Sequence, residues 1–182
     1  DTETLPIVGI GASAGGLNAL KKFFENIPNH TGISFVIVMH LSPEHKSVLA
    51  ELLQPYVNMP VQQVNKSTQL KPDHVYVIPP NANLNTIDTH LRLSKLEKKL
   101  SERAPIDHFF HTLAETHGGQ SVGIILTGTG SDGTLGMKEI KEKVDQLTLE
   151  MKKREEVTWQ RQKQSEQVIQ SHEELKKKLD EI

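Results

Sequence analysis

Three residues with complementary chemistry each follow an apolar, mostly β-branched stretch of the chain. They are Ser13 after residues 5–10, His40 after residues 33–39, and Asp132 after residues 121–126. A hydroxyl, an imidazole and a carboxylate can form a hydrolytic triad, in which the histidine takes the serine proton and the aspartate orients the imidazole and stabilises its charged form. The backbone N–H groups that could stabilise the oxyanion are those of Ala14, Thr129 and Gly130.

The glycine-rich segment around Ser13 has more than one interpretation. Residues 11–15 fit G-x-S-x-G, a strand-to-helix elbow that exposes a nucleophilic serine. Residues 9–14 also fit the dinucleotide fingerprint G-x-G-x-x-A, which needs an acidic residue about twenty positions further on. No Asp or Glu occurs between residues 26 and 43. A third interpretation, a glycine turn with a helix-capping serine, also stays open.

The elements that would position these residues alternate between buried strands and helices. Apolar runs predict strands at 5–10, 33–39, 61–64, 74–78 and 121–126, a hairpin at 83–87 and 91–96, and helices at 17–27, 47–54, 106–117 and from 134. This alternation predicts an α/β fold with a doubly wound, mostly parallel Rossmann-like sheet in three αβα layers. In such sheets, sites lie beyond the carboxyl ends of the strands, where all three candidate residues fall.

The composition excludes several kinds of site. With 182 residues, a net charge of −2 and no cysteine, the chain offers no thiolate metal site and no general attraction for nucleic acid. No apolar run could span a membrane and no signal peptide is visible, so we expect a cytoplasmic protein without membrane insertion. Of the histidines His45, His108 and His111, only the last two share a predicted helix, and no third ligand has suitable spacing, so we expect no metal and no cofactor. Since residue 1 is Asp, we expect a part of a longer chain.

A change of composition divides the chain into a body, residues 1–141, and a helical tail, residues 142–182. All nine prolines and all twelve glycines precede residue 137. From residue 144, steps of three and four select a seam with seven apolar residues out of twelve, which predicts a coiled coil with a weak middle and possible self-association. The alternative is a single solvated helix. The seam is Val144, Leu147, Met151, Arg154, Thr158, Arg161, Ser165, Val168, His172, Leu175, Leu179 and Ile182.

Five blocks of the sequence also resemble a known family. They read GIGASAGG, VMHLSPEHKS, VYVIPPN, ERAPIDHFF and GIILTGTGSDGTLGM. In order and spacing they resemble the catalytic domain of the chemotaxis protein-glutamate methylesterases (CheB-type), over about residues 5–141. The resemblance implies a Rossmann-like sheet without a nucleotide. It also implies hydrolysis of glutamate methyl esters on the cytoplasmic helices of chemoreceptors or a related sensory protein, with deamidation of receptor glutamines in many members.

The resemblance also assigns roles to residues. It implies that Ser13 is the nucleophile, His40 the base and Asp132 the orienting acid, and Thr129 stands where the family often has methionine beside the oxyanion site. The family's domain continues past residue 141 with further strands and helices, so we expect this body to be incomplete there and to expose an apolar sheet edge. We expect no receiver domain before the body, because HLSPEHKS resembles the branch that is fused to a methyltransferase and sensor modules.

Two functional hypotheses follow from these observations. The first is a serine esterase that acts on protein glutamate methyl esters, which the intact Ser13, His40 and Asp132 favour. The second is an inactive or truncated methylesterase fold that serves as an interaction module through its coiled coil. A nucleotide-binding protein is a distant third hypothesis, because the acidic residue of the fingerprint is absent.

Overall fold

The computed structural model describes residues 5–13, 15–41, 48–95, 104–127 and 131–180. The chain separates into two units, Asp1–Val144 and Asp145–Ile182. Each unit is described by itself below.

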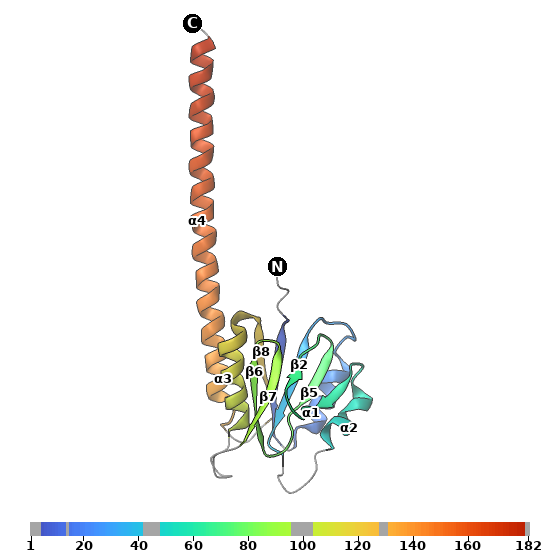
Figure 1. The fold of residues 1–182 in the computed structure, drawn as a ribbon. Coiled ribbons are helices and arrows are strands. Elements are labelled where there is room, and N and C mark those ends of the chain that lie inside the picture. The colour runs from blue at the N-terminus through green and yellow to red at the C-terminus, as the bar shows by residue number, and fades with distance from the viewer. Residues whose placement is uncertain (1–4, 14, 42–47, 96–103, 128–130, 181–182) are drawn as a thin grey trace. The chain divides into compact units, whose positions relative to one another are not determined.

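The first unit is built on a five-stranded sheet in the order β3-β5-β2-β1-β8 (Figure 1). Its strands are β1 (Ile7–Ala12), β2 (Ser34–Met39), β3 (Val61–Gln63), β5 (His74–Val77) and β8 (Ser121–Thr127). All neighbouring pairs in this sheet are parallel. Every residue of β1 and β2 is buried, as expected for central strands that are covered on both faces. The predicted mostly parallel α/β sheet is confirmed.

The order of the strands locates the place where a site can form. From β1 the chain moves to β2 and on to β5 in one direction, and then returns to β8 on the other side of β1. The boundary between β1 and β8 is therefore a topological switch point, and α/β sheets of this kind generally bind ligands at such a point, beyond the carboxyl ends of the strands. Ser13 follows β1 at this boundary.

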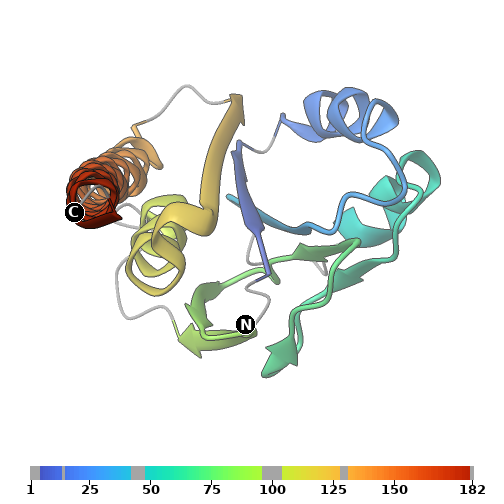
Figure 2. The same ribbon diagram turned by 90° about the horizontal axis from the view of Figure 1, so that it is seen from above.

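Two layers cover the sheet, one on each face (Figure 2). One face packs against α1 (Leu17–Glu25) and α2 (Leu49–Leu53), which a 3₁₀ turn at Gln54–Tyr56 extends. The other face packs against α3 (Pro105–His117) and a small antiparallel sheet, β4-β7-β6. The strands of the small sheet are β4 (Thr68–Gln69), β6 (Ala82–Ile87) and β7 (His90–Lys95). The predicted hairpin thus forms a sheet of its own instead of joining the parallel one.

Two glycines of β1 allow α3 to lie directly on the strand. A Cβ atom at Gly9 would come within 2.9 Å of the rings of Phe109 and Phe110, and a Cβ atom at Gly11 within 2.6 Å of Ile106. The start of α3 therefore lies over the carboxyl end of β1, and the helix runs antiparallel to the strand. This arrangement brings the N–H groups of the first turn of α3 to the edge where the candidate residues lie.

The last helix, α4 (Thr134–Asp180), begins in the first unit and continues through the second unit. Ile140 is buried in the cluster that includes α3, and Met137 packs against it. Gly123 of β8 makes room for this helix, because a Cβ atom there would lie 2.4 Å from Met137 Sδ. The strand predicted to be buried at 121–126 is instead an edge strand: β8 pairs with β1 on one side only among the described residues, and its Val122 and Ile125 remain 52% and 40% exposed.

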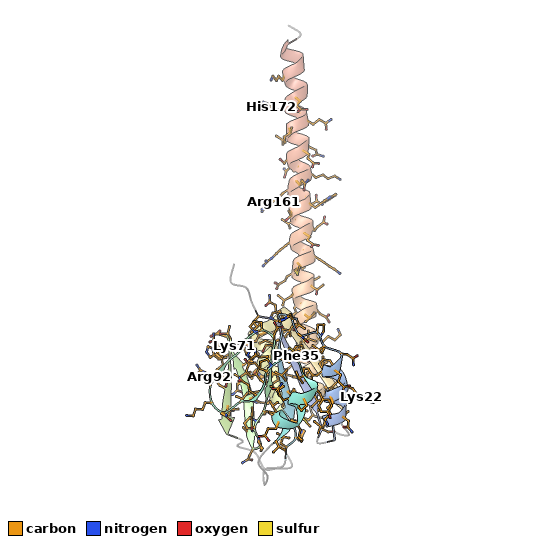
Figure 3. All side chains as sticks on the ribbon, turned by 90° about the vertical axis from the view of Figure 1, so that its right-hand side faces the viewer. Lys22, Phe35, Lys71, Arg92, Arg161 and His172 are labelled. Atoms are coloured by element: carbon orange, nitrogen blue, oxygen red, sulfur yellow. The ribbon has the colours of Figure 1, made fainter. Side chains whose placement is uncertain are left out.

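The second unit consists of the remainder of α4. Every described side chain between residues 145 and 173 is exposed, and Figure 3 shows Arg161 and His172 extending from the helix. Its described contacts are local, such as the hydrogen bonds from Gln160 to Glu156 and from Gln162 to Glu166. Among the described residues, no helix is long and apolar enough to cross a membrane. The coiled coil remains a prediction.

Candidate active site

Ser13 lies at the carboxyl end of β1, beside the end of β8. Its N–H donates to the carbonyl oxygen of Thr127 (N···O 3.0 Å), and its own carbonyl accepts from the N–H of Gly16 (2.8 Å). The Oγ atom lies 3.5 Å from Oγ1 of Thr127. Gly16 is the N-cap of α1, and no side chain caps this helix. Among the described residues Ser13 makes no side-chain capping bond to α1, so the structure gives no support to its interpretation as a helix-capping serine.

His40 follows directly after β2 and lies next to Asp132. Because Met39 pairs with Ala12 in parallel register, His40 and Ser13 occupy equivalent positions on neighbouring strands, which run about 4.8 Å apart. Nε2 of His40 lies 2.7 Å from Oδ2 of Asp132. The side chain of His40 is 44% exposed and that of Asp132 is 13% exposed, so the pair opens to solvent on the histidine side.

The Asp132 carboxylate also accepts two hydrogen bonds from the first turn of α3. The Ile106 N–H donates to Oδ2 (3.1 Å) and the Asp107 N–H donates to Oδ1 (2.8 Å). Ala104, the N-cap of α3, makes no side-chain capping bond. Asp132 therefore satisfies N–H groups that the helix itself leaves unpaired, at an end where the helix dipole favours negative charge. Both carboxylate oxygens are held, and Oδ2 still faces His40.

Asp107 returns this support to the segment that carries Asp132. Its Oδ1 accepts from the N–H of Gly136 (2.8 Å) in the first turn of α4. The two helices thus cap each other, since the carboxylate that precedes α4 binds the start of α3 and a carboxylate of α3 binds the start of α4. The segment that carries Asp132 is therefore bound to the first turn of α3 by hydrogen bonds in both directions.

The contact with Asp132 also decides which nitrogen of His40 is free. A carboxylate only accepts hydrogen bonds, so Nε2 carries the proton and donates to Oδ2. In the neutral imidazole, Nδ1 is then the nitrogen that keeps its lone pair. The imidazole can accept a proton at Nδ1, and the carboxylate stabilises the charge that results.

The sequence-predicted residues are thus brought together in part. His40 is hydrogen-bonded to Asp132, and the Ser13 hydroxyl lies next to the hydroxyl of Thr127. Among the described residues there is no hydrogen bond between Ser13 and His40. The predicted oxyanion groups, those of Ala14, Thr129 and Gly130, lie outside the described residues.

Sequence analysis missed two residues of this region, Thr127 and Asp107. For Asp107 a signal existed, because a proline at the start of a helix followed by an acidic residue in the first turn is typical of a helix N-terminus. For Thr127 the sequence offered only its place as the last residue before a glycine-rich turn.

The two histidines that were considered as metal ligands face different partners. His108 Nε2 contacts Oδ1 of Asn85, while His111 contacts Glu139 (2.6 Å) and Glu115 (3.5 Å). Burial lowers the pKa of His108, and the neighbouring charge of His111 lowers it further. In the part of the chain that the structure describes, no three His, Cys, Asp or Glu side chains form a group that could hold a metal ion.

Comparison with known protein families gives a match over most of the chain. The family described as CheB methylesterase matches residues 8–172. This match extends to residue 172 and thus into α4, past residue 141, where the sequence motifs end. A putative protein-glutamate methylesterase/protein-glutamine glutaminase of Leptospira interrogans is 36% identical over 134 residues, which cover 73% of this chain and 69% of the relative.

Two further comparisons agree with this match. Protein-glutamate methylesterase/protein-glutamine glutaminase 4 of Burkholderia thailandensis is 31% identical over 139 residues, 76% of this chain but 41% of the longer relative. The crystal structure of the Thermotoga maritima CheB methylesterase catalytic domain superposes with a TM-score of 0.68 at 28% identity, and the match covers 77% of this chain and 76% of that domain.

Proposed function

The chain belongs to the CheB methylesterase family, and on this premise we propose that Ser13, His40 and Asp132 hydrolyse glutamate methyl esters on a chemoreceptor or a related sensory protein. The observation that carries the proposal is the contact between His40 Nε2 and Asp132 Oδ2 at 2.7 Å. This contact lies beyond the carboxyl ends of the strands, where Ser13 follows β1. Glutamine deamidation at the same site is a second reaction of the same class, because an amide carbonyl reacts with the same nucleophile.

The first half of the reaction forms an acyl-enzyme. His40 Nδ1 takes the proton from Ser13 Oγ while Oγ attacks the ester carbonyl, and negative charge develops on the carbonyl oxygen. Asp132 stabilises the imidazolium through the proton on Nε2. The tetrahedral intermediate then breaks its bond to the methoxy oxygen, which receives the proton from Nδ1 and leaves as methanol.

The second half of the reaction regenerates the serine. Water gives a proton to His40 Nδ1 and attacks the acyl carbon, and Ser13 Oγ leaves with that proton. The products are a glutamate carboxylate and free enzyme, so one ester and one water give one acid and one methanol. The 44% exposure of the His40 side chain is compatible with the entry of this water.

The test is methanol release from a methylated receptor fragment by the parent chain and by S13A. Loss of the nucleophile in a working triad costs on the order of a millionfold in turnover. The matched control is S67A, which removes the hydroxyl of an exposed serine that is not one of the proposed site residues. Release by the parent and S67A but not by S13A supports the proposal. A folded parent that releases no methanol, or an active S13A, contradicts it.

A further inference from the structure

Thr127, the last residue of β8, makes two contacts with the proposed nucleophile. Its carbonyl oxygen accepts from the N–H of Ser13 at 3.0 Å, and its Oγ1 lies 3.5 Å from Ser13 Oγ. We infer that Thr127 is a positioning residue, whose hydroxyl holds the Ser13 hydroxyl in the orientation for attack. This inference rests on the proposed function of Ser13.

The pairing of β1 with β8 explains why Thr127 faces Ser13. The strands pair in even register up to Gly11, which lies opposite Ile125, but the next residue, Ala12, lies opposite Thr127. One residue of β8 is thus passed over. Because side chains alternate between the faces of a strand, such an irregularity changes the direction of the residue that follows it. The irregularity falls at the strand end that carries Ser13, where it sets the direction of Thr127.

Packing also holds the Thr127 side chain in place. A Cβ atom at Gly16 would lie 2.7 Å from Thr127 Oγ1, 2.7 Å from the Cβ of Ala12 and 3.0 Å from the carbonyl oxygen of Ser13. The hydroxyl of Thr127 therefore lies close to Gly16, the N-cap of α1, and Thr127 as a whole is half-buried. This neighbour limits the positions that the Thr127 hydroxyl can take on one side, which favours a defined orientation toward the nucleophile.

The direction of the hydrogen bond follows from the state of His40. Nδ1 of His40 is the acceptor for the serine proton, so the Ser13 hydroxyl must donate to His40 during the reaction. Thr127 then donates its own hydroxyl proton to Ser13 Oγ, which has two lone pairs and still presents one to the ester carbon. Thr127 keeps its proton throughout. The separation of 3.5 Å is long for two hydroxyls and is expected to shorten when substrate binds.

The experiment measures the reactivity of Ser13 itself, with an alkyl fluorophosphonate as the probe. Ser13 Oγ bonds to phosphorus, fluoride leaves, and the serine proton passes to His40 and on to solvent. T127V removes the hydroxyl at nearly constant volume, and T127S keeps it. The matched control is T86V, because Thr86 is a strand threonine whose hydroxyl also contacts a second hydroxyl, that of Thr116, at 2.7 Å and away from Ser13. Unfolding by denaturant reports the stability of each variant.

A positioning role predicts a specific pattern. T127V lowers the maximal labelling rate constant about tenfold, as expected for one hydrogen bond of about 1.4 kcal/mol. The probe concentration at half-maximal rate stays unchanged, because binding of the probe is unaffected. T127S labels within about threefold of the parent, and T86V labels at the parent rate even where its stability falls. If T127V does not fold, T127C takes its place, because its thiol differs from T127S by one atom and is a weak donor.

Other outcomes overturn the inference and separate it from the proposed function. Labelling of T127V at the parent rate, or equal losses in T127V and T127S, removes the positioning role while Ser13 remains the nucleophile. If the parent is not labelled at Ser13, the nucleophile proposal fails and the role of Thr127 fails with it. If the parent is labelled at Ser13 but releases no methanol, only the proposed methyl ester substrate is contradicted. The comparison of T127V with T127S then still decides the role of Thr127.

Discussion

The body and the tail of this chain obtain their order from different sources. In the body, His40 and Asp132 come from distant parts of the sequence and are in contact, and Ser13 follows the strand beside that of His40, because parallel strands end at one edge. In the tail, residues 145–173 are exposed and their described contacts lie within four positions. A substitution in the body therefore acts on tertiary geometry, whereas the same substitution in the tail acts mainly on local helix preference.

The largest effect is expected for D132N. An amide has one acceptor oxygen, so it cannot accept from His40 and also from the N–H groups of Ile106 and Asp107 as the carboxylate does. His40 then loses its tautomer and its charge stabilisation, and turnover falls by on the order of 10⁴-fold. Methanol release measures this loss. The same removal of one negative charge in the tail, E150Q, should leave turnover unchanged; an active D132N would refute the role of the carboxylate.

The next effect concerns α4, which contributes to both units. Ala at Gly136 would place its Cβ 2.4 Å from the Cβ of Phe110 and 3.0 Å from the Asp107 carbonyl oxygen, so G136A should lower the free energy of unfolding by roughly 1–3 kcal/mol. It should also reduce turnover, because the reciprocal capping of α3 and α4 lies at this contact.

The matched change in the tail is S171A in the same helix. Ser171 is exposed and donates to the Gln167 carbonyl oxygen, and Ala has the higher helix propensity, so the helix should become slightly more stable. Denaturation followed by the near-ultraviolet circular dichroism of Tyr56 and Tyr76 reports the body, and the fluorescence of Trp159 reports the tail. Equal changes in the free energy of unfolding in G136A and S171A would contradict the proposal that tertiary packing stabilises the body and local helix preference stabilises the tail.

The part of the site that could be predicted from the sequence is the part that depends on strand order. Ser13, His40 and Asp132 each follow an apolar run, and parallel strands put such positions at one edge. The contacts that Ser13 and Asp132 make with their neighbours could not be predicted, because they depend on strand register and helix packing, which the pattern of apolar residues does not specify. The passed-over residue in β8 turns Thr127 toward Ser13, and α3 lies close enough to β1 at Gly11 for its first turn to hold Asp132. The independent sheet β4-β7-β6 was missed for a related reason, since hairpin signals indicate which strands pair locally but not which larger sheet they join.

A smaller effect concerns the dependence of stability on pH. Burial lowers the pKa of His108, as does the nearby His111; burial also lowers the pKa of His117, against an opposing effect of Asp88. Between the folded pKa values and the ordinary value of 6.5, the unfolded chain binds more protons than the folded chain. The contribution is fully present above about pH 6.5 and is lost as the pH falls through the folded values.

Denaturation of the body at pH 7, 6 and 5 measures this slope. H108Q should make the slope shallower, because one of the two histidines no longer takes up a proton on unfolding. The control in the tail is H172Q, at an exposed position of α4, which should leave the slope as it is in the parent. A slope that does not change in H108Q would show that burial of this imidazole does not govern the stability of the body in this range.

The smallest effect on activity, and the sharpest test of the tail, comes from its apolar seam. Leu147 lies on the predicted seam and Leu149 lies off it, yet both are exposed, at 39% and 55%. If two tails pair along the seam, L147K places a charge in the interface and should shift sedimentation toward the monomer, while L149K costs the same helix propensity and should leave association unchanged. Turnover should be equal in both variants, because the site lies in the body. A parent that sediments as a monomer at high concentration would favour a single solvated helix. Equal shifts in the two variants would favour it too, because the apolar side chains of such a helix do not pack against a second tail.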